Sequence, residues 1–121
     1  MRSSDLRKIK VFKGDPDGYF KKHLELINPF LPVPLTPKEV EVLSCFMSLS
    51  GNIVDEERFG TTSRKYVKKT LNLSDGGLSN YIMALRKKGF IRSKDGIDYI
   101  PGVLLPNEKE QIYMFKLVNN V

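Results

Sequence analysis

The hydrophobic pattern of the N-terminal part of the chain predicts a strand, a helix and an extended strap. Polar and apolar residues alternate over 8–13, which indicates a short strand. Asp15 followed by Pro16 is typical of a helix start, because aspartate caps the helix and proline fits its first turn. The helix should end at Asn28-Pro29, since the residue before a proline avoids the helical region. Prolines then predict an extended segment from Phe30 to Pro34.

A second helix is predicted by the capping signal at residues 36–39. Thr36-Pro37-Lys38-Glu39 combines a capping box with proline at the first helical position. Apolar residues then recur at helical spacing to about Leu49, and Gly51 is expected to cap the end of this helix. A short strand is expected at Ile53-Val54.

Two further helices follow, and the polar face of the first is strongly basic. Thr62 or Ser63 should cap the first, which runs to about Leu71 or Asn72. Its expected buried face is Tyr66, Val67, Thr70 and Leu71, and its open face is Arg64, Lys65, Lys68 and Lys69. Ser74 should cap the second helix, which ends at Gly89. Its expected inward residues are Leu78, Tyr81 or Ile82, and Leu85, and its outward residues are Asp75, Gly76, Ser79, Asn80 and Met83.

After Gly89 the hydrophobic period changes to that of strands. Phe90-Ile91-Arg92 and residues 97–100 are predicted strands, joined by a tight turn at Asp95-Gly96. Apolar residues at 103–105 and 111–118 flank a polar turn. Residues 112–118 are the strongest strand signal, with Tyr113, Phe115 and Leu117 expected to face the helical core. The N-terminal strand, the strap or a second subunit is expected to cover the opposite face.

Positive charge is concentrated between residues 58 and 94. This segment holds ten basic residues and one acidic residue, Asp75, a net charge of +9. The rest of the chain holds ten basic and thirteen acidic residues, a net charge of −3. A local positive field of this kind attracts a polyphosphate such as DNA.

Helix, turn, helix and hairpin is the element order of a winged helix, which is an α+β fold. The sequence of residues 73–91 resembles the recognition helix of winged helix-turn-helix families such as the MarR-like regulators. The matching features are Leu78-Ser79 at the start of the helix body, Ile82 and Leu85 at helical spacing, and the exit Lys88-Gly89-Phe90-Ile91. The resemblance covers residues 61–95 well and 36–118 loosely. It implies a three-helix core with a β-hairpin wing, to which the residue pattern adds an N-terminal strand and helix.

A second, weaker resemblance concerns the residues after the hairpin turn. Tyr99-Ile100-Pro101 is similar to winged-helix plasmid replication proteins, although isoleucine stands where those proteins have asparagine before the proline. Small basic winged helices of this sort also occur in bacteriophages. The resemblances therefore imply DNA binding in transcription or replication control.

The expected DNA-binding residues follow from how a recognition helix lies in the major groove. Its N-terminal half faces the bases, so Asn80 can pair with adenine and Ser79 can reach a base or a phosphate. Gly76 leaves room for close approach of the backbone. The complete predicted set is Arg64, Lys65, Lys68, Lys69, Ser74, Gly76, Ser79, Asn80, Arg86, Lys87, Arg92 and Lys94.

The composition points away from several other classes. One cysteine, Cys45, and one histidine, His23, are too few for a Cys/His zinc site or a Cys–His nucleophile pair. We expect Cys45 to be a small core residue and His23 to be a packed or surface residue, and we expect no enzyme activity, no metal and no cofactor. No run reaches the roughly 20 apolar residues of a membrane span. The basic N-terminus has no apolar core behind it, and the single cysteine fits a reducing compartment, so we expect a cytoplasmic protein, or a host-cytoplasmic or virion protein if it is phage-encoded.

The sequence leaves two functions open. The first is a winged-helix protein that binds double-stranded DNA. The second is a structural or adaptor protein, such as a phage virion component, that uses the same surface to contact protein or a second copy of the chain. We divide the chain into an N-terminal extension, 1–35, and a winged-helix domain, 36–121.

Overall fold

A computed structural model of the chain describes residues 16–49, 58–106 and 113. Tyr113 lies in neither a helix nor a strand. Several sequence predictions fall outside the described residues: the strand at 8–13, the caps at Asp15 and Gly51, the strand at 53–54, and the strand at 112–118 apart from Tyr113.

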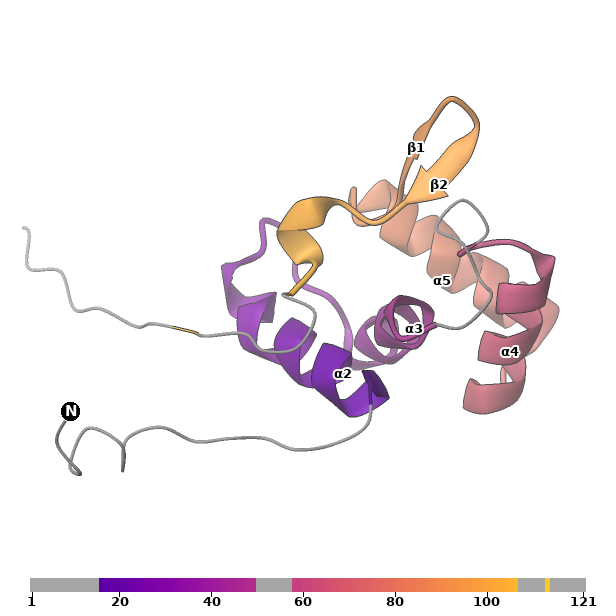
Figure 1. The fold of residues 1–121 in the computed structure, drawn as a ribbon, viewed down its shortest axis with the longest axis horizontal. Coiled ribbons are helices and arrows are strands. Elements are labelled where there is room, and N and C mark those ends of the chain that lie inside the picture. The colour runs from indigo at the N-terminus through magenta and orange to yellow at the C-terminus, as the bar shows by residue number, and fades with distance from the viewer. Residues whose placement is uncertain (1–15, 50–57, 107–112, 114–121) are drawn as a thin grey trace, which may run out of the picture.

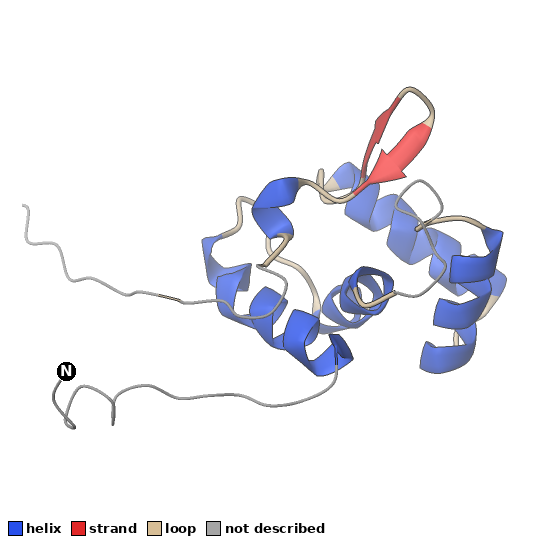
Figure 2. Cartoon of the chain, viewed as in Figure 1, coloured by secondary structure: helices blue, strands red, loops and turns tan. Residues whose placement is uncertain are grey.

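The described residues form an α+β structure of four α-helices and one antiparallel hairpin (Figures 1 and 2). The helices are α2 (Pro16–Ile27), α3 (Pro37–Met47), α4 (Thr61–Leu71) and α5 (Asp75–Lys87), and the strands are β1 (Arg92–Lys94) and β2 (Ile97–Tyr99). Two short 3-10 helices, η1 (Asn28–Phe30) and η3 (Gly102–Leu104), follow α2 and β2.

Helix α3 lies at the centre, seen end-on between α2 on one side and α4 with α5 on the other (Figure 1). It starts with the predicted capping box, because the Thr36 side chain accepts from the Glu39 amide and the Glu39 side chain accepts from the Thr36 amide. Its C-cap is Ser48, earlier in the chain than the cap expected at Gly51. Arg58 Nη1 also donates to the carbonyl of Phe46 at this end, at 2.9 Å.

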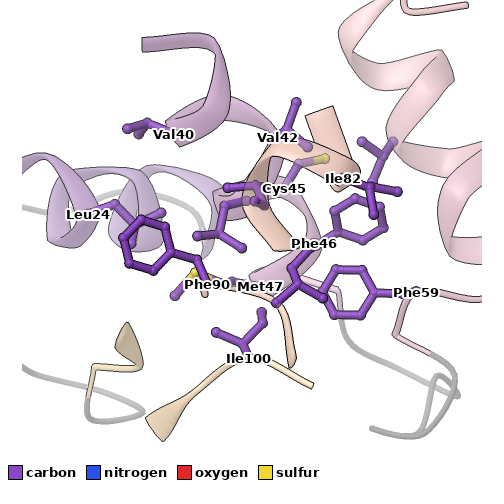
Figure 3. Close-up of a cluster of buried hydrophobic side chains, with 14 of the residues drawn as sticks. Leu24, Val40, Val42, Cys45, Phe46, Met47, Phe59, Ile82, Phe90 and Ile100 are labelled. Carbon is purple, nitrogen blue, oxygen red and sulfur yellow. The ribbon is translucent and has the colours of Figure 1, made fainter. Parts of the chain in front are cut away.

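One buried cluster joins all four helices to the segment after the hairpin (Figure 3). The rings of Phe46 and Phe59 lie 4.7 Å apart within it. Val67 and Leu85 are fully buried, which confirms their predicted inward positions, and Cys45 is buried as well. Leu24 of α2 belongs to the same cluster, so the N-terminal helix packs on the helices that follow it. The division of the chain at residue 35 stays a prediction.

Helix α4 differs from its predicted start and buried face. Gly60 is the N-cap and makes no side-chain cap bond, so the predicted cap at Thr62 or Ser63 was wrong. Ser63 and Val67 are buried one turn apart, and Leu71 is half-buried. Tyr66 and Thr70 are exposed, contrary to the prediction. Ser63 takes an inward position on the face of Val67 and Leu71, so the buried face of α4 is rotated away from Tyr66 and Thr70.

Helix α5 and the turn before it match the sequence predictions closely. Ser74 is the N-cap, and its hydroxyl accepts from the Gly77 amide at 3.0 Å. Leu78, Ile82 and Leu85 are buried, while Tyr81 is half-buried against the core. At the other end Gly89 takes a φ of 82°, and the Phe90 amide donates to the Leu85 carbonyl at 2.9 Å. This is a Schellman cap, so the expected role of Gly89 is confirmed.

The hairpin is shorter than predicted but has the expected turn. Asp95 and Gly96 both have positive φ, 54° and 78°, which is the backbone of a tight type I′ connection. Phe90 and Ile91 are buried residues that precede β1, so the predicted strand start at Phe90 was wrong. The side chains of Phe90 and Ile91 belong to the core. Strand pairing with β2 begins at the next residue, the exposed Arg92.

Two segments expected to be extended contain short 3-10 helices instead. Phe30 belongs to η1 and residues 31–33 are bends, so the extended strap predicted for residues 30–34 was wrong over most of its length. Residues 103–105, expected to flank a turn as part of a sheet, lie largely in η3. Leu104 is fully buried there, and its carbonyl accepts from His23 Nε2 at 2.8 Å. The segment therefore forms a short helix that contacts α2, and it does not extend the hairpin.

Candidate nucleic-acid interface

Helices α4 and α5 border a shallow groove of about 240 Å³. Asn72 turns the chain between the two helices, with a left-handed φ of 55° at the end of α4. The groove is lined by Thr61, Arg64, Lys65, Lys68, Asp75, Leu78 and Ser79. The structure thus brings three of the predicted basic residues of α4 beside Ser79 of α5.

The outward face of α5 carries polar groups over its first two turns. Gly76, Ser79 and Asn80 are exposed, as predicted. A Cβ placed on Gly76 would meet nothing within 4 Å, so the backbone is open to solvent at that position. Ser74 is also exposed, but its hydroxyl already caps the helix, which leaves it less able to contact DNA than the sequence suggested.

Lys68 and Asp75 form an ion pair across the mouth of this groove. The Lys68 Nζ donates to Asp75 Oδ1, and this hydrogen bond and the charge of Lys68 hold the pKa of Asp75 below its ordinary value. The only acid between residues 58 and 94 therefore lies beside a lysine that sequence analysis assigned to phosphate binding. Asp75 is ionised at neutral pH and can only accept hydrogen bonds.

The hairpin is tied to α5 by a second ion pair. Arg86 Nη2 lies 2.5 Å from Asp98 Oδ2 of β2, and Ser93 of β1 donates to the other oxygen of Asp98. Arg92 Nε donates to the Gly89 carbonyl at 3.0 Å, which fixes the entry to the hairpin. Arg86 and Arg92 thus orient the hairpin relative to α5, a role that the charge pattern alone did not reveal.

Other basic residues of the 58–94 segment support the fold itself. Arg64 Nε donates to the Phe59 carbonyl at 2.9 Å. Lys88 lies 2.5 Å from the buried carboxylate of Glu39. Burial raises the pKa of Glu39, but hydrogen bonds from Lys88 and Thr36 and the charge of Lys88 bring it below its ordinary value.

Lysines with exposed ammonium groups remain on the same elements. Among the described residues no ion pair or hydrogen bond joins a side chain to Lys65, Lys69, Lys87 or Lys94, and all four are exposed. They come from α4, from the end of α5 and from β1. The net charge counted along the sequence overstated the positive field, because Glu39 and Asp98 approach this segment from outside its limits.

A buried histidine, His23, belongs to α2, and α2 lies on the other side of α3 from α4 and α5 (Figure 1). His23 donates from Nε2 to the Leu104 carbonyl, so Nδ1 is left to accept from the Tyr113 hydroxyl. Burial lowers the pKa of His23, although the bond to Leu104 acts in the opposite direction. His23 was expected to be either packed or at the surface, and it is buried; no signal in the sequence indicated its distant partners.

The described ranges contain no cluster of three or more residues that could hold a metal ion. None of their helices has the length and apolar character needed to cross a membrane. No protein-family model matches the chain, and no curated protein or solved structure is significantly similar to it.

Proposed function

We propose that this chain is a winged-helix protein that binds double-stranded DNA and acts in transcription or replication control. In this proposal α4 and α5 are the helix-turn-helix, α5 is the recognition helix, and the hairpin β1–β2 is the wing. The observation that carries it is the groove between α4 and α5, where Arg64, Lys65 and Lys68 lie beside the exposed first turns of α5.

The arrangement of chemical groups suits a duplex. The outward turns of α5 offer Ser79 and Asn80 to base edges. Gly76 lies on the same exposed face and has no side chain that would keep DNA away from them. In this proposal Lys65 and Lys69 of α4 contact phosphates beside the groove, and Lys94 of β1 contacts the DNA backbone beyond it. Backbone contacts of this kind position the protein, while base contacts select the sequence.

The direct test is binding to random duplex DNA at increasing salt. Four exposed lysines and the open N–H groups of Arg64 and Arg92 would neutralise about four to six phosphates. Counterion release then predicts a fall in affinity of about 10²–10³ between about 50 and 200 mM salt. No detectable binding at the low-salt end would refute the proposal.

A charge-matched pair of variants separates this surface from general basicity. Lys65→Gln with Lys69→Gln removes two exposed charges from α4, and the salt dependence should become less steep by about two contacts. Lys21→Gln with Lys22→Gln removes the same charge from α2, on the far side of α3, and should leave the slope unchanged. Equal effects of the two pairs would contradict the proposed interface.

The alternative, a structural or adaptor protein that contacts another protein, is favoured by one observation. Met83 is 65% exposed in the middle of the outward face of α5, and Tyr66 of α4 is 48% exposed. Apolar side chains of this kind are enriched in protein interfaces, whereas on DNA Met83 would contact a thymine methyl group. Loss of self-association or partner binding in Met83→Lys, without DNA binding by the wild type, would support the alternative.

A further inference from the structure

We infer that Asp75 is a specificity-determining residue that selects cytosine in the DNA strand read by the start of α5. The inference rests on the proposed function and goes beyond it by naming a base and the group that reads it. The one acidic side chain of the 58–94 segment lies on the surface proposed to meet DNA, where a negative charge would be expected to repel the phosphates.

The position of Asp75 places a carboxylate where base edges would lie. Asp75 is the first residue of α5 and lines the same groove as Ser79, which is one helical turn further on. Its side chain is 86% exposed. The interaction with Lys68 uses Oδ1, which leaves Oδ2 as a second acceptor on this exposed side chain.

The chemistry of the major groove favours cytosine as the partner of such a group. Guanine presents N7 and O6, thymine presents O4, and adenine presents N7 beside its amino group, so each offers an acceptor that repels a carboxylate. Cytosine presents the N4 amino donor and no acceptor. An ionised carboxylate that can only accept hydrogen bonds is therefore matched to cytosine and mismatched to the other three bases.

Lys68 makes a carboxylate tolerable on this surface. Its ammonium lies against Asp75 and offsets the negative charge that would otherwise repel the neighbouring phosphates. The same contact holds one carboxylate oxygen, Oδ1, against Lys68. Lys68 is thus a positioning residue for Asp75, in addition to any phosphate that its remaining N–H groups reach.

The test is a selection from a random duplex library with the full-length protein, comparing wild type, Asp75→Ala and Glu25→Ala. Wild type should enrich cytosine at one position of its site, and Asp75→Ala should lower that preference about tenfold. Asp75→Ala should also bind the other three bases at that position more tightly, because a repulsive group has been removed. Glu25→Ala removes an exposed acid from α2 and should keep the wild-type preference.

Thermal melts of the three proteins show that each is folded before selection. An identical base preference in wild type and Asp75→Ala would overturn the inference while leaving DNA binding intact. A uniform rise in affinity of Asp75→Ala for every sequence would also overturn it, since the carboxylate would then act only as a charge. Absence of duplex binding by wild type would instead refute the proposed function on which the inference rests.

Discussion

Lys88 Nζ lies 2.5 Å from Glu39 Oε1 and 2.9 Å from the Pro34 carbonyl oxygen, and so joins the end of α5 to the start of α3. Glu39 is 5% exposed and also accepts from the Thr36 amide within the capping box. A lysine that belongs to the basic segment is therefore a structural residue. Its carboxylate partner lies 49 residues away in the chain.

Lys88→Met should lower the free energy of unfolding by about 1.5–3 kcal/mol, the range for a hydrogen bond to a charged group. The methionine keeps the length of the side chain but leaves the buried carboxylate of Glu39 without its cation. Lys87→Met is the matched control, because Lys87 is exposed on the same turn, and it should change stability by less than about 0.5 kcal/mol. Equal urea midpoints for the two variants would contradict this role of Lys88.

Leu85→Ala and Val67→Ala should each lower the free energy of unfolding, because both residues are 0% exposed and their truncation leaves a cavity in the core. Leu85→Ala should cost about 2–5 kcal/mol, a large share of a total stability of about 5–15 kcal/mol. Met83→Ala, two residues away on the exposed face of α5, should leave the melting temperature nearly unchanged. A Leu85→Ala melt that coincides with wild type would show that the phase of α5 is wrong.

The stability of the fold should decrease as the pH falls from about 6.5. The pKa of His23 is lowered in the folded protein from the ordinary value of 6.5, so the unfolded chain binds the proton more readily. Stability is therefore lost between that value and the lower pKa of the folded state. His23→Gln can keep the donor to the Leu104 carbonyl and should flatten the pH dependence in this window.

A separate acid-induced loss should begin only below about pH 4.5, where Glu39 starts to accept a proton in the unfolded chain. The two windows are distinguished by urea unfolding at a series of pH values. A pH profile of His23→Gln that matches wild type between pH 7 and 5 would show that His23 does not control this transition.

Asn80→Ala and Lys69→Ala should affect DNA binding in different ways. Asn80 can make two hydrogen bonds to adenine, so its loss should cost about 1–3 kcal/mol at one base position and relax sequence choice there. Lys69→Ala should weaken binding to every sequence alike, because a phosphate contact carries no base information. Selection from a random library decides between them, and uniform weakening by Asn80→Ala would mean that this face does not read bases.

Local signals in the sequence were sufficient where one short segment decides the structure. The capping box at Thr36, the cap at Ser74 and the end of α5 at Gly89 each depend on residues within a few positions, and all were predicted. The turn at Asp95-Gly96 likewise follows from two residues that tolerate positive φ.

Long-range contacts explain the predictions that were wrong or missing. No residue near Val103 indicates that the Leu104 carbonyl accepts from His23, which is 81 residues away. The same residues give no indication that this segment forms the 3-10 helix η3. Tyr66 was predicted to be buried from its helical position, yet the polar Ser63 is buried on α4 and Tyr66 is exposed. The pairing of Arg86 with Asp98 depends on how the hairpin folds back, which a count of charges along the chain does not contain.

The labelling rate of Cys45 can report how often the core of this protein opens. Cys45 is the chain's one cysteine, and its side chain is 3% exposed at the centre of the core. A thiol reagent can reach it only when the packing around α3 opens, so the labelling rate of the unaltered protein measures how often that opening occurs. Any bound molecule that holds α3, α4 and α5 together will slow the reaction, which makes the native thiol a screen for ligands of this fold.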